Sequence, residues 1–183
     1  MLSLFTFPVI TALLEPLFIK TKLNIIHVFL GIIVLIGIYI LAPKFDFESS
    51  QVKGILLGLF SALCYALRNL TLKRHIAQYS GTALMMHQIL ILSVLLIPFM
   101  LTMDISNLTT QYPYVILLAL ITTAIGHSIF IHSLKYFSVS TASIINSIQP
   151  VLGIVMAFFF LKEIPTWNTF FGGSLILATV IIE

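Results

Sequence analysis

The sequence predicts an all-α membrane protein with seven transmembrane helices. Sixty per cent of its 183 residues are hydrophobic and only 8% are charged, whereas a soluble domain typically carries about 25% charged residues. A soluble fold could not cover so much apolar surface, but a bilayer removes that need, because a spanning helix takes roughly 20 mostly apolar residues. Polar separators divide the chain into seven such stretches, at residues 2–19, 24–42, 54–72, 82–102, 113–133, 139–161 and 166–182.

Composition and motifs argue against several other classes of protein. Cys64 is the only cysteine, so neither an intrachain disulfide nor a cysteine-cluster metal site is expected. The net charge of +3 comes from lysines and arginines in the separators, which is typical of membrane topology rather than of nucleic-acid binding. The motifs of zinc proteases, serine hydrolases, P-loop proteins and dinucleotide-binding enzymes are absent. We therefore expect no enzyme activity, no metal and no cofactor.

The basic residues of the separators predict an orientation in the membrane. Separators that alternate along the chain lie on the same side, and one side carries five lysines and arginines against three on the other. The positive-inside rule places the larger group in the cytoplasm, so the N-terminus would lie outside and the C-terminus inside. The two groups are Lys20, Lys22, Lys73, Arg74 and Lys135 against Lys44, Lys53 and Lys162.

Two segments of the chain share a proline, a lysine and a glycine at matching positions. Pro8–Ile40 aligns with Pro150–Ile182 without gaps at an offset of 142 residues, with eight of 33 positions identical. Identity alone is weak in apolar sequence, but a proline near the start, a lysine at the break and a glycine in the second helix all coincide. We interpret the two segments as copies of one unit. The coinciding residues are Pro8 and Pro150, Lys20 and Lys162, and Gly31 and Gly173.

The spacing of the copies predicts an inverted repeat. They are five expected helices apart, and an odd shift reverses the direction in which a helix crosses the membrane. Inverted-topology repeats are typical of secondary transporters, whose substrates bind near the bilayer midplane between the repeats. Residues 1–42 would then be the last two helices of a first five-helix repeat, residues 43–53 an extramembrane loop, and residues 54–183 a complete second repeat. Three further helices are expected before Met1.

The second copy carries a family resemblance in the segment STASIINSIQPVLGIVMAFFFLKEIPTWNTFFGGSLILATVII. Its small polar start, Pro150, the Leu-Lys-Glu that closes the helix, and the pair Gly172 and Gly173 resemble the EamA type of the drug/metabolite transporter superfamily. Two positions depart from the pattern, since Lys162 replaces the usual glycine and Thr21 replaces the acidic residue of the first copy.

The resemblance implies an N-terminally truncated ten-helix transporter built from two five-helix repeats. It implies export of small organic metabolites by alternating access, across the cytoplasmic membrane and most readily the bacterial inner membrane. The expected partners are membrane lipid, a small-molecule substrate and a proton gradient. The alternative is a non-transporting membrane protein or an inactive remnant of such a transporter. Substrate, direction, coupling ion and homo-oligomer formation stay open at this point.

The expected helix at 54–72 has two distinct faces. Small residues recur at every fourth position and predict a seam for close helix packing. Tyr65 and Arg68 follow an adjacent stripe and are candidates for lining a substrate cavity. The alternative for Arg68 is that its side chain reaches the cytoplasmic interface, because Lys73 follows closely. The seam consists of Gly54, Gly58, Ala62 and Ala66.

The expected helix at 139–161 also carries polar residues on one face. Ser143, Asn146 and Pro150 lie three and four residues apart, and Gln149 flanks them. Proline removes a backbone donor and leaves the carbonyl four residues earlier without its helical partner, which can then face a cavity. We therefore include Ser143, Asn146 and Gln149 among the cavity candidates. The alternative is an ordinary kink at Pro150 that helps the helices fit together.

Three ionisable residues inside expected spans are further candidates. His87 and His127 are expected to be buried, where a histidine could bind substrate or relay a proton, or simply bond to a neighbouring helix. Glu15 is the only acidic residue deep within an expected span, and a carboxylate there is a natural proton-coupling group. Pro16 should kink its helix. The alternative for Glu15 is an interfacial carboxylate that reaches Lys20 or Lys22.

Overall fold

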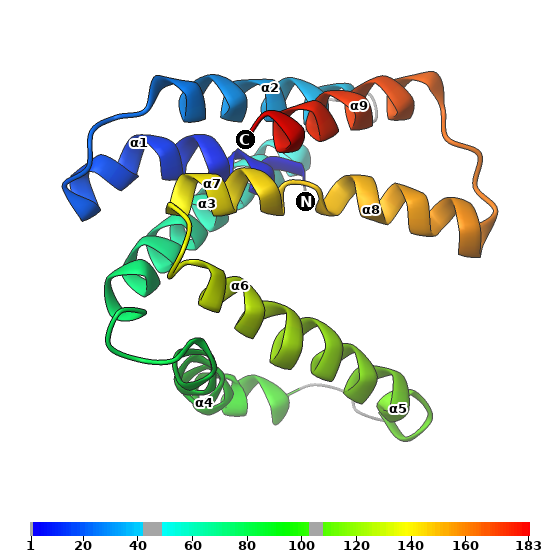
Figure 1. Cartoon of the computed structure of the whole chain (residues 1–183). Helices are drawn as coiled ribbons and strands as arrows, with labels where there is room; N and C mark the ends of the chain where they lie inside the picture. Colours follow the sequence, from blue (N-terminus) through cyan, green and yellow to red (C-terminus); the bar gives the residue numbers. More distant parts are fainter. Residues whose placement is uncertain (1, 42–48, 103–107) are drawn as a thin grey trace. The chain divides into compact units, whose positions relative to one another are not determined.

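The computed structural model describes residues 2–41, 49–102 and 108–183, and the regular structure within these ranges is helical (Figure 1). The chain divides into two compact units. The larger unit combines the chain up to Thr71 with Ser138–Glu183, and the smaller unit is Leu72–Phe137. An all-helical fold is thereby confirmed for the described residues.

The larger unit contains two helix pairs and most of a long helix. Its elements are the 3₁₀ turn η1 (Leu2–Thr6), α1 (Phe7–Ile19), α2 (Ile25–Leu41), α3 (Ser49–His75) as far as Thr71, α7 (Val139–Asn146), α8 (Gln149–Met156), the π-helical turn η3 (Ala157–Leu161) and α9 (Trp167–Ile182). Of these, α2 lies along α9 and α1 lies along α7 (Figure 1).

The helices α2 and α9 approach each other closely because glycines meet at their crossing. A Cβ on Gly172 would lie 2.6 Å from the carbonyl oxygen of Gly37, and a Cβ on Gly37 would lie 2.9 Å from the carbonyl oxygen of Gly172. Close approach of backbones through small residues is the usual mode of packing in membranes. The core beside this crossing consists of Val34, Ile38, Val151 and Ile176.

The smaller unit packs α4 against α6. It contains the end of α3, then α4 (Gly81–Met100), α5 (Leu108–Leu118), the π-helical segment η2 (Ala119–His127) and α6 (Ser128–Ser133). A Cβ on Gly81 would lie 2.9 Å from the backbone nitrogen of His132, so the start of α4 sits directly on α6. The Lys73 ammonium donates to the carbonyl oxygens of Leu134 and Phe137 at the end of α6.

Helix positions follow the expected apolar stretches, with two corrections at their starts. α3 begins at Ser49, so residues 49–53 are helical rather than loop, while residues 43–48 of the expected loop lie outside the described ranges. α5 begins at Leu108, before the expected start at residue 113. Proline favours the early turns of a helix, and Pro113 lies inside α5, within two turns of its start. The apolar windows of spanning length nevertheless begin at Val52 and Gln111, close to the expected starts of the spans.

Four helical stretches of the described chain are long and apolar enough to cross a membrane. They are Val52–His75, Gly81–Met100, Gln111–Ser133 and Val139–Leu161. Three further apolar helices are shorter, at Ser3–Ile19, Ile25–Leu41 and Trp167–Ile182. The arrangement of seven spans in repeats stays a prediction.

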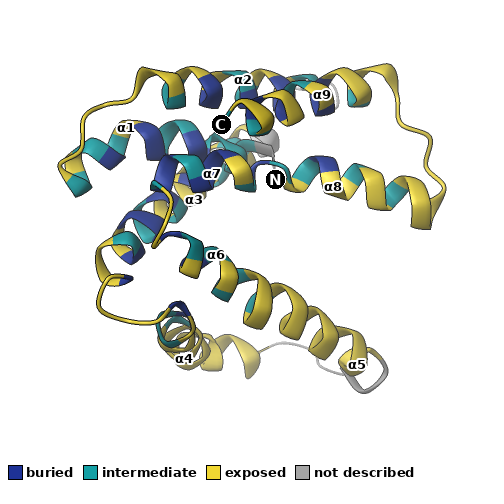
Figure 2. Cartoon of the chain, viewed as in Figure 1, coloured by how far each residue is buried: buried dark blue, intermediate teal, exposed yellow. Residues whose placement is uncertain are grey.

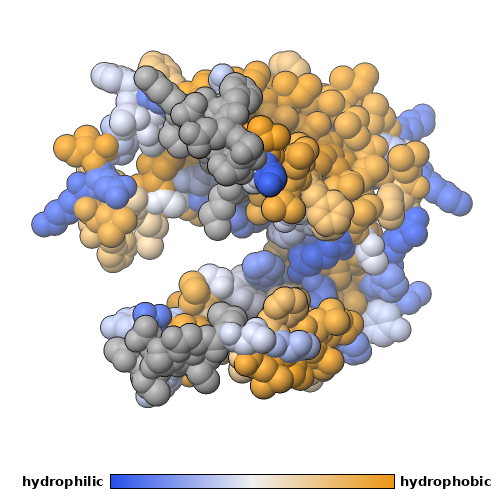
Figure 3. Space-filling view, turned by 180° about the vertical axis from the view of Figure 1, so that it is seen from behind, coloured by the Kyte–Doolittle hydropathy of each residue, from blue (hydrophilic) through white to orange (hydrophobic). Residues whose placement is uncertain are grey.

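Apolar side chains cover much of the surface of both units. Most of α4 and α5 is exposed although both helices are apolar (Figure 2), and broad areas of the face seen in Figure 3 are hydrophobic. Soluble monomers rarely expose such continuous apolar area, whereas lipid tails solvate it without cost. The seam on α3 is buried at Ala62 and Ala66, but a Cβ on Gly54 would meet no atom within 4 Å.

Candidate functional site

The carboxylate of Glu15 in α1 binds the first turn of α7. The backbone N–H of Val139 donates to Glu15 Oε1 at 2.8 Å, and the backbone N–H of Ser140 donates to Oε2 at 2.9 Å. The Ser140 hydroxyl also donates to Oε2. Glu15 is 6% exposed. The carboxylate therefore reaches neither expected partner lysine through these bonds, and instead neutralises the positive end of a helix from another part of the chain.

The start of α7 has its backbone donors fully used. Ser138 is the N-cap residue, and its hydroxyl accepts from the backbone N–H of Thr141 at 3.0 Å. The N–H of Ala142 donates to the Ser138 carbonyl at 3.1 Å, which begins the regular helix. Because Glu15 takes the two intervening N–H groups, no donor of this buried turn is left to water.

A second carboxylate binds α7 from another side. The Thr141 hydroxyl donates to Glu183 Oε1 at 2.6 Å, and His27 Nε2 of α2 lies 3.1 Å from the same oxygen. Asn24, which caps the start of α2 through the N–H of Ile26, lies 3.3 Å from His27 Nε2. Side chains from α1, the start of α2 and the end of α9 thus converge on a single turn.

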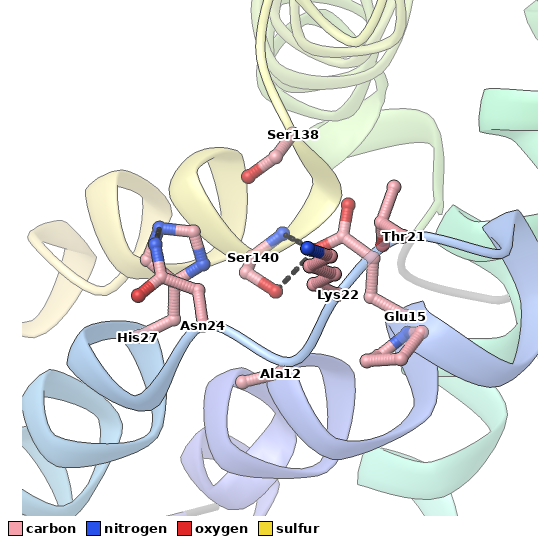
Figure 4. Close-up of a pocket in the computed structure, with 9 residues that line it drawn as sticks. Ala12, Glu15, Thr21, Lys22, Asn24, His27, Ser138 and Ser140 are labelled. Atoms are coloured by element: carbon pink, nitrogen blue, oxygen red, sulfur yellow. Dashed lines mark hydrogen bonds between the residues drawn. The ribbon is translucent and has the colours of Figure 1, made fainter.

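A cavity of about 200 Å³ lies beside this turn (Figure 4). Figure 4 shows Ser140 bonded to the Glu15 carboxylate and the side chains of His27 and Asn24 across the cavity from it. Polar and charged groups line the cavity on the side of the α1–α2 connection. The lining residues are Ala12, Glu15, Pro16, Thr21, Lys22, Asn24, His27, Ser138 and Ser140.

A row of polar side chains runs between α3 and the junction of α7 with α8. The Gln149 amide donates to Asn146 Oδ1 at 2.8 Å, and the Asn146 amide donates to the Tyr65 hydroxyl at 3.4 Å. The Arg68 guanidinium lies 5.6 Å from the centre of the Tyr65 ring, and donates to Asn69 Oδ1 at 3.2 Å. We call Tyr65, Arg68, Asn69, Asn146 and Gln149 the polar row.

The helix is interrupted where the polar row meets it. α7 ends at Asn146 and α8 begins at Gln149, with Pro150 in its first turn. The N–H groups of Ser147 and Ile148 turn back to carbonyls three residues earlier. The residue four positions after Asn146 is proline, which has no N–H, so the Asn146 carbonyl receives no helical bond from it. Backbone polarity and side-chain polarity therefore coincide at this point.

Comparison with known proteins identifies the family. Residues 52–182 match the EamA-like transporter family. The chain belongs to this family. It is 26% identical over 148 residues to an uncharacterized transporter of Archaeoglobus fulgidus, an alignment that covers 81% of this chain and 53% of the relative. The chain thus spans about half the length of that curated relative. No solved structure matches the chain significantly.

Family membership and the apolar helices together make the chain an integral, multi-pass membrane protein. The exposed apolar surfaces of the two units are then lipid-facing or packed against further protein. Within the described residues, no group of three histidine, cysteine, aspartate or glutamate side chains could hold a metal ion.

The structure distributes the expected site residues unevenly. Tyr65, Arg68, Asn146 and Gln149 come together in the polar row. Ser143 does not, because its side chain is fully buried and its hydroxyl lies 3.5 Å from that of Thr11 in α1. The two residues expected on one helix face therefore contact different helices: Asn146 contacts α3, whereas Ser143 contacts α1.

The two histidine candidates lie in the smaller unit. His87 was expected to be buried, but the structure exposes it on α4, with Nδ1 3.2 Å from the carbonyl oxygen of Ala83. His127 is half-buried, with Nδ1 2.8 Å from the carbonyl oxygen of Thr122 at the end of the π-helical segment. Both rings thus bond to the backbone of their own helical stretch. In the larger unit, the expected kink residue Pro16 lies within α1, which continues past it to Ile19.

Sequence reasoning did not select several residues that hold the Glu15 cluster together. Ser138, Ser140 and Thr141 lie together at the start of one expected helix, whereas His27 and Glu183 lie far away in the sequence, at the ends of two others. A usable signal existed for Ser138, because serine immediately before an apolar helix is a typical N-cap. Nothing in the sequence indicated that Glu15 would bind that same turn.

Proposed function

We propose that the chain forms part of a secondary transporter that moves small organic metabolites across the cytoplasmic membrane by alternating access. Family membership and the relative named as a transporter support transport. Export is the direction we propose, following the resemblance of the second copy to exporters of the superfamily. The bacterial inner membrane is the proposed location. Lipid, the substrate and a proton gradient are the proposed partners.

The polar row is the observation that carries this proposal. Polar side chains within apolar helices cost free energy in a membrane unless they bond to one another or face a cavity. Here, Tyr65 and Asn146 approach from two helices at a break in one of them. Interrupted helices whose backbone groups line a cavity are the common form of substrate sites in transporters. We propose that the row contacts substrate.

The row also limits the kind of substrate we propose. Tyr65, Asn146 and Gln149 supply hydroxyl and amide groups, which both donate and accept hydrogen bonds. Arg68 is engaged by the Tyr65 ring and Asn69. Amino acids and related metabolites with neutral polar groups fit this set better than strongly anionic compounds.

The repeat organisation is part of the proposal. We propose that residues 1–42 end a first repeat and that residues 54–183 form a second, inverted one; the family match over residues 52–182 supports the second boundary. The two copies also share backbone detail. Lys20 and Lys162, equivalent at the offset of 142, end their helices in the same left-handed conformation, with φ of 56° in both.

Transport by proteoliposomes containing the product of the native gene tests the proposal. Preloaded vesicles should show saturable exchange of one class of metabolite and not of others. Tyr65→Phe removes the hydroxyl that accepts from Asn146 while keeping the ring against Phe7 and Arg68. We expect KM to rise about 2–10-fold with little change in expression, because one hydrogen bond contributes about 0.5–1.5 kcal/mol.

Ser61→Ala is the matched control, since Ser61 lies one turn away on α3 and is exposed. It should leave KM unchanged. Absence of saturable flux over a broad metabolite panel would instead favour a non-transporting membrane protein or an inactive remnant.

A further inference from the structure

We propose that Glu15 is a proton-binding site whose occupancy controls the position of α7. In its ionised form, the carboxylate holds the first turn of α7 against α1; protonation releases that turn. We call this contact between Glu15 and the first turn of α7 the latch. The inference rests on the proposed transport function only for its biological meaning, because the latch is a property of α1 and α7 that can be measured without substrate.

The argument begins with the fixed direction of the donors. The N–H of Val139 donates to one carboxylate oxygen and the N–H of Ser140 to the other. Backbone N–H groups cannot reverse their role, so both oxygens must act as acceptors. Only the ionised carboxylate has two good acceptor oxygens. The geometry therefore selects the charged form of Glu15.

Protonation opposes this geometry in two ways. The added hydrogen turns one carboxylate oxygen into a donor and a weaker acceptor, so one of the two backbone N–H groups loses its partner. Protonation also removes the negative charge from the positive end of α7, where an anion is stabilising. A Ser140 hydroxyl can rotate to accept from the acid, but the two N–H groups cannot.

The released turn is connected to the proposed substrate site through one short helix. α7 spans only Val139–Asn146, so the residue that Glu15 holds and the residue that contacts Tyr65 lie at opposite ends of the same element. Ser143, midway, contacts Thr11 of α1. A shift of the first turn is therefore carried to Asn146, and the interruption after it allows α8 to stay in place.

Protons reach Glu15 through the cavity beside it, which is lined by exposed residues of the α1–α2 connection as well as by Glu15. Other charged or titratable groups face this region: Lys22 and His27 from the α1–α2 connection and the start of α2, and Glu183 from the end of α9. The His27–Glu183 pair holds Thr141 and so forms a second attachment of α7. Any test must separate the two attachments.

The test is a distance measurement between α1 and α7 as a function of pH. Nitroxide labels replace the exposed residues Leu13 and Ile145 in a Cys64→Ala background, because Cys64 is itself exposed. Pulsed electron resonance on the protein in lipid nanodiscs, without substrate, gives the distance distribution. We expect one short population at high pH and a growing longer population as the pH falls.

Glu15→Gln is the decisive variant. An amide offers only one acceptor atom and adds donors that face the N–H groups of α7, so we expect the longer population at every pH. His27→Gln should keep the pH response, because Glu15 is intact. If His27→Gln abolishes the response, or if Glu15→Gln retains it, the assignment to Glu15 is wrong.

Ser140→Ala keeps the test interpretable if Glu15→Gln does not fold. It removes one donor to the ionised carboxylate but leaves the backbone N–H groups in place, so the longer population should be larger than in the parent protein measured at the same pH. An unchanged longer population in Ser140→Ala, or a pH-independent distance in the parent, overturns the latch. A working latch without metabolite flux would instead leave this inference standing and count against the proposed transport.

Discussion

The helix pairs α1–α2 and α8–α9, 142 residues apart in the chain, begin and end alike but differ in the second half of their first helix and in their polar groups. Pro8 and Pro150 both stand in the first turn of their helix. Both first helices end at a left-handed lysine, Lys20 with ψ of 32° and Lys162 with ψ of 28°. Such agreement at lysines, which rarely adopt positive φ, supports the proposed equivalence of the two helix pairs.

Helix starts and helix contacts match as well. Asn24 caps α2, and its equivalent Thr166 caps α9, where its hydroxyl accepts from the N–H of Thr169. Gly31 faces Val9 within the first pair, and their equivalents Gly173 and Val151 face each other within the second. The contact is tighter in the first pair, where a Cβ on Gly31 would lie 2.8 Å from Val9 against 4.0 Å for Gly173.

The difference between the pairs lies in their polar groups. Glu15 occupies the position equivalent to Ala157, and His27 the position equivalent to Thr169. α1 stays α-helical to Ile19 and is held by α7, whereas the matching stretch Ala157–Leu161 is π-helical and largely exposed. Under the proposed repeat, only the first pair carries a carboxylate at this position, and this asymmetry is what the proposed one-sided proton latch requires.

The largest effect is expected where the two pairs touch. Gly172→Ala places a methyl group 2.6 Å from the Gly37 carbonyl and 2.8 Å from Leu41, and the carbonyl cannot move without displacing α2. Overpacking of this kind typically costs about 1–3 kcal/mol. We expect a clear loss of thermal stability in detergent, followed by fluorescence-detected size exclusion after heating.

Gly173→Ala is the matched control, because its nearest neighbour beyond its own helix lies 4.0 Å away. It should be neutral or slightly stabilising, since alanine favours helix more than glycine does. Equal losses in the two variants would show that α2 and α9 do not cross at Gly172.

An intermediate effect is expected at the helix caps. Thr166→Ala and Asn24→Ala each remove the side chain that accepts from the first turn, so each should cost about 1 kcal/mol. Asn24→Ala also removes the contact with His27, so it should cost more than Thr166→Ala. The same unfolding assay measures both. A larger loss for Thr166→Ala would show that the polar cluster around His27 adds nothing to the first pair.

Much of the fold could be predicted because it depends on length and hydrophobicity. Apolar stretches of spanning length appear as helices close to their expected bounds, and the tyrosine and arginine one turn apart on α3 do meet. Such features are local, since helical spacing alone decides which side chains share a face.

The partners of those faces could not be predicted. The sequence predicts a carboxylate inside a span at Glu15. It does not indicate the partners of this carboxylate, because they are backbone N–H groups, which every residue except proline carries. Likewise, spacing placed Ser143 and Asn146 on one side of a helix, yet a different helix covers each. His87 was expected to be buried because it is a polar residue within an apolar helix. Its exposure depends on tertiary packing, since none of the described residues covers it.

The smallest effect is expected at the two left-handed lysines, and it tests the equivalence of the pairs most directly. Left-handed backbone costs an L-residue about 1–2 kcal/mol, a strain that glycine avoids. Glycine's greater freedom in the unfolded chain opposes folding and cancels roughly 0.5–1 kcal/mol of this gain. Lys20→Gly and Lys162→Gly should therefore each raise the free energy of unfolding slightly, by about 0.5–1 kcal/mol. Both side chains are exposed, so little packing is lost. Equal gains in the free energy of unfolding at the two positions would support the same backbone conformation at the ends of both helices. A gain at one site and a loss at the other would mean that one of the lysines is held by a contact that its equivalent lacks.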